Sequence, residues 1–164
     1  MAEVIDENWP IHIVSTGLKD ILVPIDTAAN LEKLVPDRKA ISAISQNKEV
    51  VGIHAFSLID DEDLTAVCRN FAPLYGIDEE AATGTANCAL ACYLYKNGIK
   101  RNPYIFEQGH NLNSISQIYV NIKSESSVIM KSENNMIEKN ERNTITKVYV
   151  GGYGYLICKK TFSI

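Results

Sequence analysis

An uncharged run from Thr85 to Tyr95 limits the folds open to this chain more than any other segment. Read as a helix, the run has apolar residues on every side of the helical wheel, and a helix of that kind is buried all round. Its small residues Ala86, Ala89 and Ala91 let neighbouring backbones approach closely. We therefore predict a fold of the α+β class, in which a strongly curved sheet wraps around one central helix.

Both ends of this helix carry recognisable signals. Thr83-Gly84-Thr85 is a typical start, and Lys96 with Gly98 is a typical end. The first N–H groups of a helix lack partners within it, so we predict that the Thr83 hydroxyl caps them. Gly84 would let a ligand approach the backbone, and the helix dipole favours a carboxylate or phosphate there. A simple N-cap that binds nothing explains the same residues.

Most of the remaining chain is predicted to form about seven or eight strands, because apolar and β-branched runs alternate with turn residues. Residues 30–45 are predicted as two short helices that Pro36-Asp37 separates. Residues 49–58 and 64–73 are predicted as an antiparallel pair, and residues 131–143 as a hairpin connection. The other predicted strand ranges are 11–17, 20–25, 103–109, 116–122, 127–131, 146–152 and 153–160.

Composition limits the classes of partner. The chain has 164 residues, 46% of them hydrophobic, and a net charge of −4. We expect one globular domain over residues 11–164 after an N-terminal tail at 1–10, and a small molecule or a protein as partner. Nucleic acid and membrane are not expected, because the chain has no basic field and no apolar run of roughly 18 residues. The acidic start differs from a signal peptide, so we expect a cytoplasmic protein.

The cysteines and histidines give no catalytic or metal-binding pattern. Cys88 and Cys92 share one helix face at a spacing that a metal could bridge, but no His, Asp or Glu accompanies them. Packing of two small apolar thiols is the favoured interpretation, and Cys68 in a predicted strand also resembles a core residue. His54 and His110 have no motif partner. We predict no metal site and no cofactor.

Residues 69–94, RNFAPLYGIDEEAATGTANCALACYL, resemble the phenazine-biosynthesis PhzF-like family. Its pattern is R-x-F-A-P followed by G-I-x-E-D-P-A-T-G-S-A and an Ala/Leu-rich helix. Similar pieces elsewhere are IVSTGLKDILVPI, LEKLVPDRKAI, FEQG and VYVGG, so the resemblance extends over nearly the whole chain. It implies a diaminopimelate epimerase-like half, in which a mixed curved sheet surrounds a central buried helix.

The resemblance also implies roles for individual residues. Glu80 stands where the family has Asp, and Thr85 where it has Ser, whereas Thr83 and Gly84 match. By resemblance, Glu80 and Thr85 are catalytic: Glu80 positions or exchanges the substrate proton. Thr85 and the backbone N–H groups of Gly84 and Ala86 hold a substrate carboxylate, and Thr83 belongs to the same binding turn. An acid that merely favours the helix N-terminus is the alternative for Glu80.

A second turn is implied to face the same cleft. Ser15, Thr16 and Gly17 are substrate-binding by resemblance, and a plain connection between two strands is the alternative. Related epimerases use a pair of thiols, one just before the Gly-Thr turn. No cysteine occupies that place in this chain, which argues against a two-thiol racemase.

The resemblance implies two halves with the active site between them, and this chain resembles the second half only. In the family the first half supplies a glutamate that acts as general base. A PhzF-like isomerase that acts by proton transfer on a small carboxylate would need that half from a separate chain or from a second copy in a homodimer. The alternatives are a non-catalytic half-domain that binds a small anion or a protein partner, and a fragment of a longer enzyme.

Overall fold

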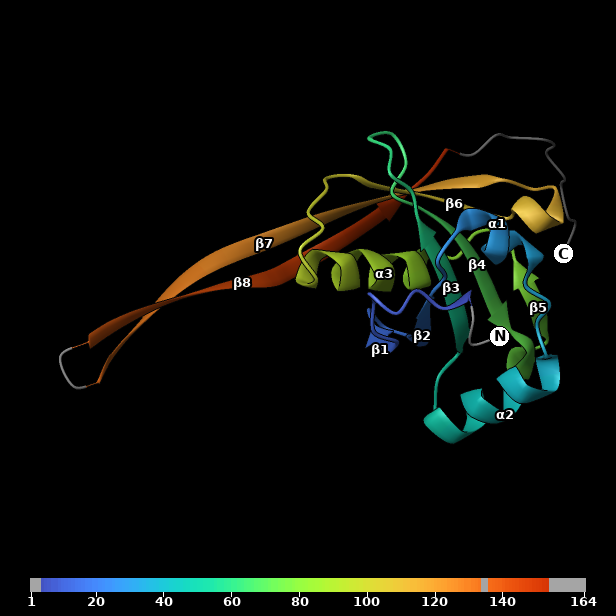
Figure 1. Cartoon of the computed structure of the whole chain (residues 1–164), viewed down its shortest axis with the longest axis horizontal. Coiled ribbons are helices and arrows are strands. Elements are labelled where there is room, and N and C mark those ends of the chain that lie inside the picture. The colour runs from blue at the N-terminus through green and yellow to red at the C-terminus, as the bar shows by residue number, and fades with distance from the viewer. Residues whose placement is uncertain (1–3, 134–135, 154–164) are drawn as a thin grey trace, which may run out of the picture.

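The computed structural model describes residues 4–133 and 136–153, with only the strands and their pairing described for residues 127–143. An eight-stranded mixed sheet curls around the helix α3 (Gly84–Lys96), as Figure 1 shows. Two shorter helices, α1 (Ala28–Lys33) and α2 (Arg38–Lys48), lie against the outer face of the sheet. The predicted α+β fold with a central helix is confirmed.

The strands follow the spatial order β1-β2-β3-β4-β6-β7-β8. The β2–β3 and β4–β6 pairs are parallel and the other pairs are antiparallel. One edge of β4 pairs first with β6 and then, further along, with β5. The bounds are β1 (His12–Ser15), β2 (Lys19–Pro24), β3 (Gly52–Leu58), β4 (Ala66–Ala72), β5 (Ile77–Glu80), β6 (Tyr104–Gln108), β7 (Ser116–Glu133) and β8 (Met136–Gly151), with 3₁₀ turns η2 (Pro73–Tyr75) and η3 (His110–Leu112).

The N-terminal half folds as its local signals predict. The strands expected at 11–17 and 20–25 are the antiparallel pair β1 and β2, and those at 49–58 and 64–73 are the antiparallel pair β3 and β4. The two helices expected within 30–45 are α1 and α2. The Asp37 carboxylate accepts hydrogen bonds from the N–H groups of Lys39 and Ala40, both at 3.0 Å, and so starts α2 directly after Pro36.

α3 is buried on most of its sides. Leu90 and Leu94 are fully buried and pack in one cluster with Phe56 and Phe106 from the sheet. The exception is a stripe that begins at the exposed residue Thr85 and faces the opening between β1 and β8. These two strands are the ends of the sheet, and they do not pair within the described residues. The curl of the sheet therefore leaves one strip of the central helix accessible.

Residues 4–10, expected to form a tail, contact the body of the domain in several places. Ile5 forms an antiparallel bridge with Ile25. The Tyr93 hydroxyl donates a hydrogen bond of 2.8 Å to the carbonyl of Pro10, and the ring of Trp9 lies 6.2 Å from the ring of Tyr93. These contacts join the start of the chain to the sheet and to α3.

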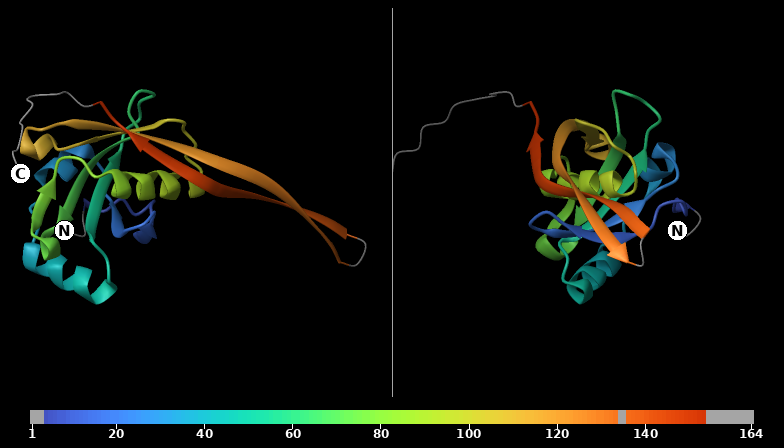
Figure 2. Two further views of the ribbon diagram at one scale, coloured as in Figure 1. Left: turned by 180° about the vertical axis from the view of Figure 1, so that it is seen from behind. Right: turned by 90° about the vertical axis from the view of Figure 1, so that its left-hand side faces the viewer.

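The C-terminal strands differ from the prediction. The strands expected at 116–122 and 127–131 are one continuous strand, β7, and most of the expected connection at 131–143 belongs to β7 and β8. The pairing extends as far as Glu133 and Met136, and the ribbon projects from the body in Figures 1 and 2. The polar residues here lie in strands and are not turn signals, because a two-stranded ribbon that leaves the body has no buried face to require apolar residues. The strand predicted at 153–160 lies beyond Tyr153, outside the described residues.

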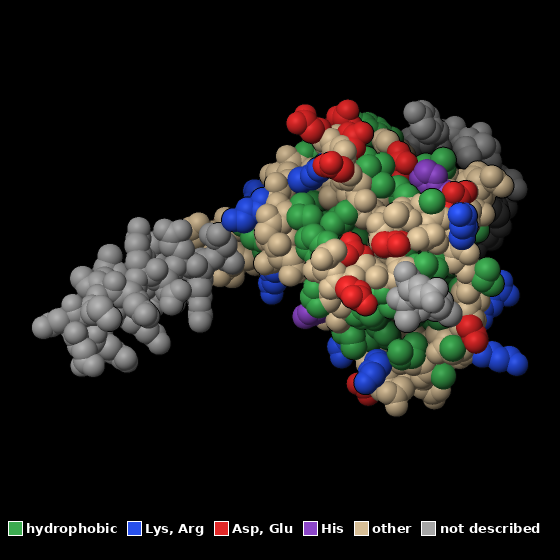
Figure 3. Space-filling model, in the orientation of Figure 1, with side chains coloured by type: hydrophobic (Ala, Val, Ile, Leu, Met, Phe, Trp, Pro, Cys, Tyr) green, Lys and Arg blue, Asp and Glu red, His purple; other side chains and the backbone are tan. Residues whose placement is uncertain are grey.

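The surface carries charges of both signs. On the face in Figure 3, basic and acidic side chains are interspersed, and the described residues form no continuous basic patch there. None of the described helices has the length and apolar character that crossing a bilayer requires.

Candidate functional site

The two neighbouring glutamates of β5 have different surroundings, because successive side chains of a strand point to opposite faces of the sheet. Glu79 lies on the outer face, where its carboxylate oxygens accept hydrogen bonds of 2.9 and 2.8 Å from Nε and Nη2 of Arg69. Arg69 also donates to carbonyls at the end of α1, including those of Leu31 at 3.0 Å and Leu34 at 2.8 Å. Glu79 therefore has a structural role, and Glu80 is the glutamate that faces inward.

Glu80 is held beside the first turn of α3. The Thr83 hydroxyl donates to Oε2 of Glu80 at 2.5 Å, and Nε2 of Gln108 donates to Oγ1 of Thr83 at 3.0 Å. The prediction that the Thr83 hydroxyl caps α3 is wrong: Thr83 is the N-cap residue, but its side chain makes no capping bond. The Thr83 oxygen accepts from Gln108 and its hydrogen is donated to Glu80, and it accepts no bond from a helix N–H group. The first N–H groups of α3 are consequently left without a side-chain cap.

A pocket opens at the gap between β1 and β8. It has a volume of about 520 Å³ and is lined by Ser15, Thr16, Thr85 and the two thiols Cys88 and Cys92, with residues of β8 on the opposite side. The Thr16 hydroxyl donates a hydrogen bond of 3.0 Å to the carbonyl of Thr85, which joins the β1–β2 turn to α3. The pocket therefore places the predicted turn residues next to the start of the helix.

A layer of buried polar side chains lies on the inner face of the sheet near this end of α3. Nδ1 of His54 lies 3.1 Å from Oδ1 of Asn70, and Nδ2 of Asn87 donates to Oε1 of Gln108 at 2.9 Å. Burial lowers the pKa of His54 to about 4, against the opposing effects of Asn70 and Asn87. His54 is therefore neutral at pH 7 and is a core residue.

Asp20 belongs to the same layer. Its side chain is 2% exposed, and its Oδ1 has no hydrogen-bond partner in the described part of the chain. Burial, and then the negative charge of Glu80, raise the pKa of Asp20 to about 6. The negative charge of Glu80 therefore acts on the Asp20 carboxyl group beneath the start of α3.

Comparison with known proteins decides the family. The family described as phenazine biosynthesis-like protein, PhzC-PhzF, has a sequence pattern that matches residues 1–155. The chain belongs to the PhzC-PhzF family.

Relatives of this PhzC-PhzF chain include named isomerases. A Deinococcus radiodurans protein described as an uncharacterized isomerase is 34% identical over 125 residues, which are 73% of this chain and 40% of the relative. The trans-2,3-dihydro-3-hydroxyanthranilate isomerase of Pseudomonas chlororaphis is 32% identical over 93 residues, which are 57% of this chain and 31% of the relative. The PhzC-PhzF chain spans less than half the length of these relatives.

A solved structure shares the fold. The crystal structure of the phenazine biosynthesis protein of the PhzF family from Bacillus anthracis matches with a TM-score of 0.66 and 20% sequence identity. The match covers 91% of this chain and 50% of that chain. The curled sheet around a central helix is thus a fold that the PhzC-PhzF chain has in common with about half of that protein.

The site residues that the sequence suggested fall into three groups in this PhzC-PhzF chain. Ser15, Thr16 and Thr85 line the pocket, whereas Glu80 and Thr83 are bonded to each other outside its lining. Gly84, Ala86 and Gly17 are not among the residues that line this pocket. Ala86 is fully buried, an added Cβ at Gly84 would meet Val150 at 3.6 Å, and Gly17 has a φ of +137° in its turn.

Sequence reasoning missed two polar residues of the site, Asp20 and Gln108. Each occupies an inward position of a strand: Asp20 is two residues from buried Leu22, and Gln108 is two residues from buried Phe106. The period of two along each strand is the signal that indicates a buried polar group. Both residues could have been found in the sequence by this pattern.

Two thiols of the PhzC-PhzF chain, those of Cys68 and Cys88, are poor nucleophiles. Burial raises the pKa of Cys88 to about 11, and burial likewise raises the pKa of Cys68. Both thiols therefore stay protonated at neutral pH. The described residues contain no group of three or more His, Cys, Asp or Glu side chains that could hold a metal ion.

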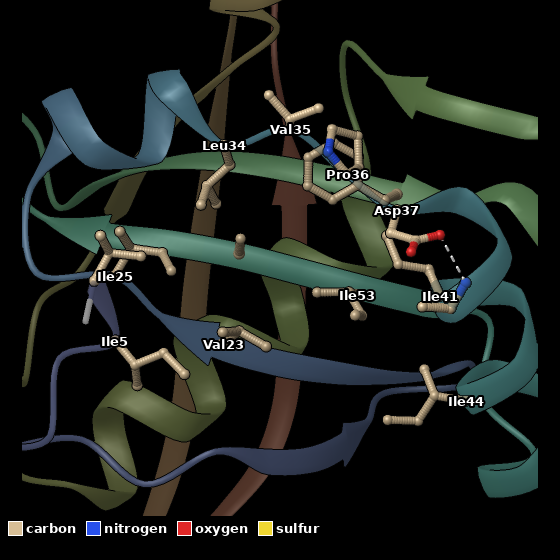
Figure 4. Close-up of a pocket in the computed structure, with 14 residues that line it drawn as sticks. Ile5, Val23, Ile25, Leu34, Val35, Pro36, Asp37, Ile41, Ile44 and Ile53 are labelled. Atoms are coloured by element: carbon tan, nitrogen blue, oxygen red, sulfur yellow. Dashed lines mark hydrogen bonds between the residues drawn. The ribbon is translucent and has the colours of Figure 1, made fainter. Parts of the chain in front are cut away.

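A separate apolar pocket lies on the outer face of the sheet, with a volume of about 270 Å³ (Figure 4). Val23 and Ile53 line it from the sheet, and Ile41 and Ile44 line it from α2. Its single charged lining residue among those described is Asp37, whose carboxylate caps α2. This pocket offers apolar surface but no side chain that is free for proton transfer.

The raised pKa of Asp20 predicts how an Asp20→Asn variant depends on pH. Between about pH 4 and 6 the folded chain holds a proton that the unfolded chain, with a carboxyl pKa of 3.8, has released. Stability from Asp20 is therefore present at low pH and is lost as pH rises through this window. The variant lacks this loss. Its free energy of unfolding, relative to that of wild type, should therefore be about 2 kcal/mol higher at pH 7 than at pH 4.

Urea unfolding of both proteins at pH 4 and pH 7 measures this difference. His54 titrates over a similar range, but it is present in both proteins and so cancels in the comparison. A stability difference that is the same at both pH values would show that Asp20 is not buried as a protonated acid.

Proposed function

We propose that this chain is the carboxylate-holding half of a PhzF-like isomerase, and that it acts on a small carboxylate by proton transfer without a metal or organic cofactor. The observation that carries the proposal is the arrangement at the start of α3. The helix N-terminus has no side-chain cap, while a hydroxyl holds the Glu80 carboxylate next to it. An anion site and a proton acceptor thus lie within one turn of chain.

The parts have distinct tasks in this proposal. The N–H groups of Gly84, Thr85 and Ala86 have no partner within α3, and together with the helix dipole they favour a ligand carboxylate. The Thr85 hydroxyl, in the pocket wall, adds a further donor. Glu80 takes a proton from the ligand or returns one to it, which is general acid–base catalysis by a positioned carboxylate.

Isomerisation by this route requires a second proton-handling group, which we place on another half of the same fold. The chain spans 40% of its Deinococcus radiodurans relative and 50% of the Bacillus anthracis protein. We infer that the second half comes from a second copy of this chain or from a separate chain, and that the ligand binds between the two halves. The open gap between β1 and β8 supports this, because it exposes the pocket on one side of the domain.

Solvent exchange tests the proposal. The probe is trans-2,3-dihydro-3-hydroxyanthranilate, after the activity in the name of the Pseudomonas chlororaphis relative. Incubated with the protein in D₂O, this carboxylate should gain deuterium at carbon, as followed by NMR. The Glu80→Gln variant should lower the exchange rate at least about 100-fold, because general acid–base catalysis contributes that much or more.

Asp78→Asn is the matched control, because Asp78 lies on the same strand but its side chain is 60% exposed and pairs with Arg38. It should leave the rate unchanged. If the second half is a second copy, light scattering on the same samples should give the mass of a dimer, and this dimer should dissociate less on dilution when the probe is present. Binding of the probe without exchange would favour a non-catalytic carboxylate binder. A protein that neither binds the probe nor exchanges its protons would contradict the proposal.

A further inference from the structure

Gln108 uses both ends of its side-chain amide, although it is fully buried at the end of β6. Its Nε2 donates to the backbone carbonyl of Glu80 at 2.7 Å and to Oγ1 of Thr83 at 3.0 Å, and its Oε1 accepts from Nδ2 of Asn87 at 2.9 Å. Asn87 Nδ2 also donates to the carbonyl of Thr83 at 2.9 Å. These bonds connect β6, the first turn of α3 and the segment from Glu80 to Thr83.

The partners determine which way the amide of Gln108 points. A carbonyl only accepts, so the atom of Asn87 that faces the Thr83 carbonyl must be its NH₂ group. The atom of Gln108 that meets this NH₂ group must then be its oxygen, which turns the NH₂ group of Gln108 towards Glu80 and Thr83. The orientation follows from the donors and acceptors alone.

The same rule gives a direction to the bonds that end on Glu80. The Thr83 hydroxyl accepts from Gln108, so its single hydrogen is free to be donated, and it goes to Oε2 of Glu80. Successive bonds that point the same way strengthen one another. Oε1 of Glu80 accepts no hydrogen bond from the described residues, so the two oxygens of this carboxylate differ.

We propose that Gln108 is a positioning residue which, through Thr83, selects Oε1 of Glu80 as the oxygen that exchanges a proton with the ligand. The proposal rests on the proposed function. In the step, a ligand C–H bond breaks, its electron pair stays on the ligand, and an O–H bond forms at Oε1. The reverse step breaks that O–H bond and forms a C–H bond, so no oxidant or reductant is needed.

Two substitutions remove the bonds while keeping the shape of the side chains. Gln108→Met keeps the length but donates nothing, and Thr83→Val keeps the volume but has no hydroxyl. In both variants Asn87 still holds the Thr83 carbonyl, which anchors the start of α3. Thr83→Ser retains the hydroxyl. Gln117→Met is the control, because Gln117 is an exposed glutamine on the adjacent strand β7.

The first measurement uses deuterium exchange into trans-2,3-dihydro-3-hydroxyanthranilate. Gln108→Met and Thr83→Val should each lower kcat at least about 10-fold and change KM by no more than about twofold, because misplacing a reacting group costs rate more than affinity. The double variant should be no slower than the slower single variant, since both changes break one connection. Thr83→Ser should recover most of the loss seen in Thr83→Val, because it restores the hydroxyl, and Gln117→Met should match wild type. Losses that multiply in the double variant would overturn the proposal.

The second measurement does not depend on activity. Carboxyl ¹³C NMR follows the titration of Asp20, whose pKa the charge of Glu80 raises. Glu80→Gln should lower this pKa. Gln108→Met and Thr83→Val should each shift it, and the double variant should shift it no further than the larger single shift, because each lets the Glu80 carboxylate move relative to Asp20.

An Asp20 pKa that stays at the wild-type value in Gln108→Met, while Glu80→Gln shifts it, would overturn the positioning role. If wild-type protein shows no deuterium exchange, the proposed function fails, and the Asp20 titration still decides the role of Gln108.

Discussion

Replacing Arg69 with alanine is expected to lower the free energy of unfolding by about 3–5 kcal/mol, because it leaves a buried charge without its partner. The side chains of Arg69 and Glu79 are only 5% and 11% exposed. Arg69 also binds carbonyls at the end of α1, and its guanidinium lies 4.9 Å from the centre of the Phe71 ring. Alanine would therefore leave the Glu79 carboxylate and the end of α1 unsatisfied together.

Arg38→Ala is the matched control for this prediction. Arg38 pairs with Asp78 at 3.1 Å, but the two side chains are 62% and 60% exposed. An exposed pair of this kind contributes about 0–1 kcal/mol. Urea unfolding of both variants measures the contrast, and Arg69→Lys should recover only part of the loss because lysine cannot form the two parallel bonds. Equal losses for Arg69→Ala and Arg38→Ala would contradict a structural role for the Arg69–Glu79 pair.

Replacing Gly52 with alanine is expected to destabilise the fold by about 3 kcal/mol, as overpacking does in a rigid core. A Cβ at Gly52 would lie 2.0 Å from the backbone carbonyl oxygen of Phe71 and 3.1 Å from Cα of Ala72. Both atoms belong to the backbone at the end of β4, so no side chain can rotate away. The end of β4 would have to move, and the pairing of β3 with β4 would be disturbed there.

Gly151→Ala serves as the comparison, because Gly151 also lies in a strand and a Cβ there would meet no atom within 4 Å. Its stability should stay within about 0.5 kcal/mol of wild type. Thermal unfolding of the two variants, monitored by circular dichroism, tests the prediction. A Gly52→Ala variant as stable as Gly151→Ala would show that the backbone at the end of β4 adjusts freely.

Local signals were sufficient for the central helix and for the N-terminal half. A run without charge between Thr85 and Tyr95 has to be buried, because it has no polar face to turn to water. The two short helices were predictable for a similar reason, since Pro36 ends one segment and Asp37 caps the next. These features depend on neighbours in the chain and can be read without knowing the fold.

The length of β7 and β8 was not predictable in the same way. Their outer parts pair with each other and with no other described strand. Strands are recognised in a sequence by the apolar residues of a buried face, and a ribbon that leaves the domain has no such requirement. The sequence therefore suggested a polar connection where the structure has strands.

The site shows the same division between local and distant causes. The sequence alone indicates a helix start with a carboxylate beside it, because Glu80, Thr83 and Gly84 are neighbours in the chain. Which group the Thr83 hydroxyl binds was decided by Gln108, which is distant in sequence and reaches Thr83 because β6 pairs with β4. The Thr83 oxygen accepts a hydrogen bond from Gln108 and none from the helix N–H groups, and its single hydrogen is donated to Glu80.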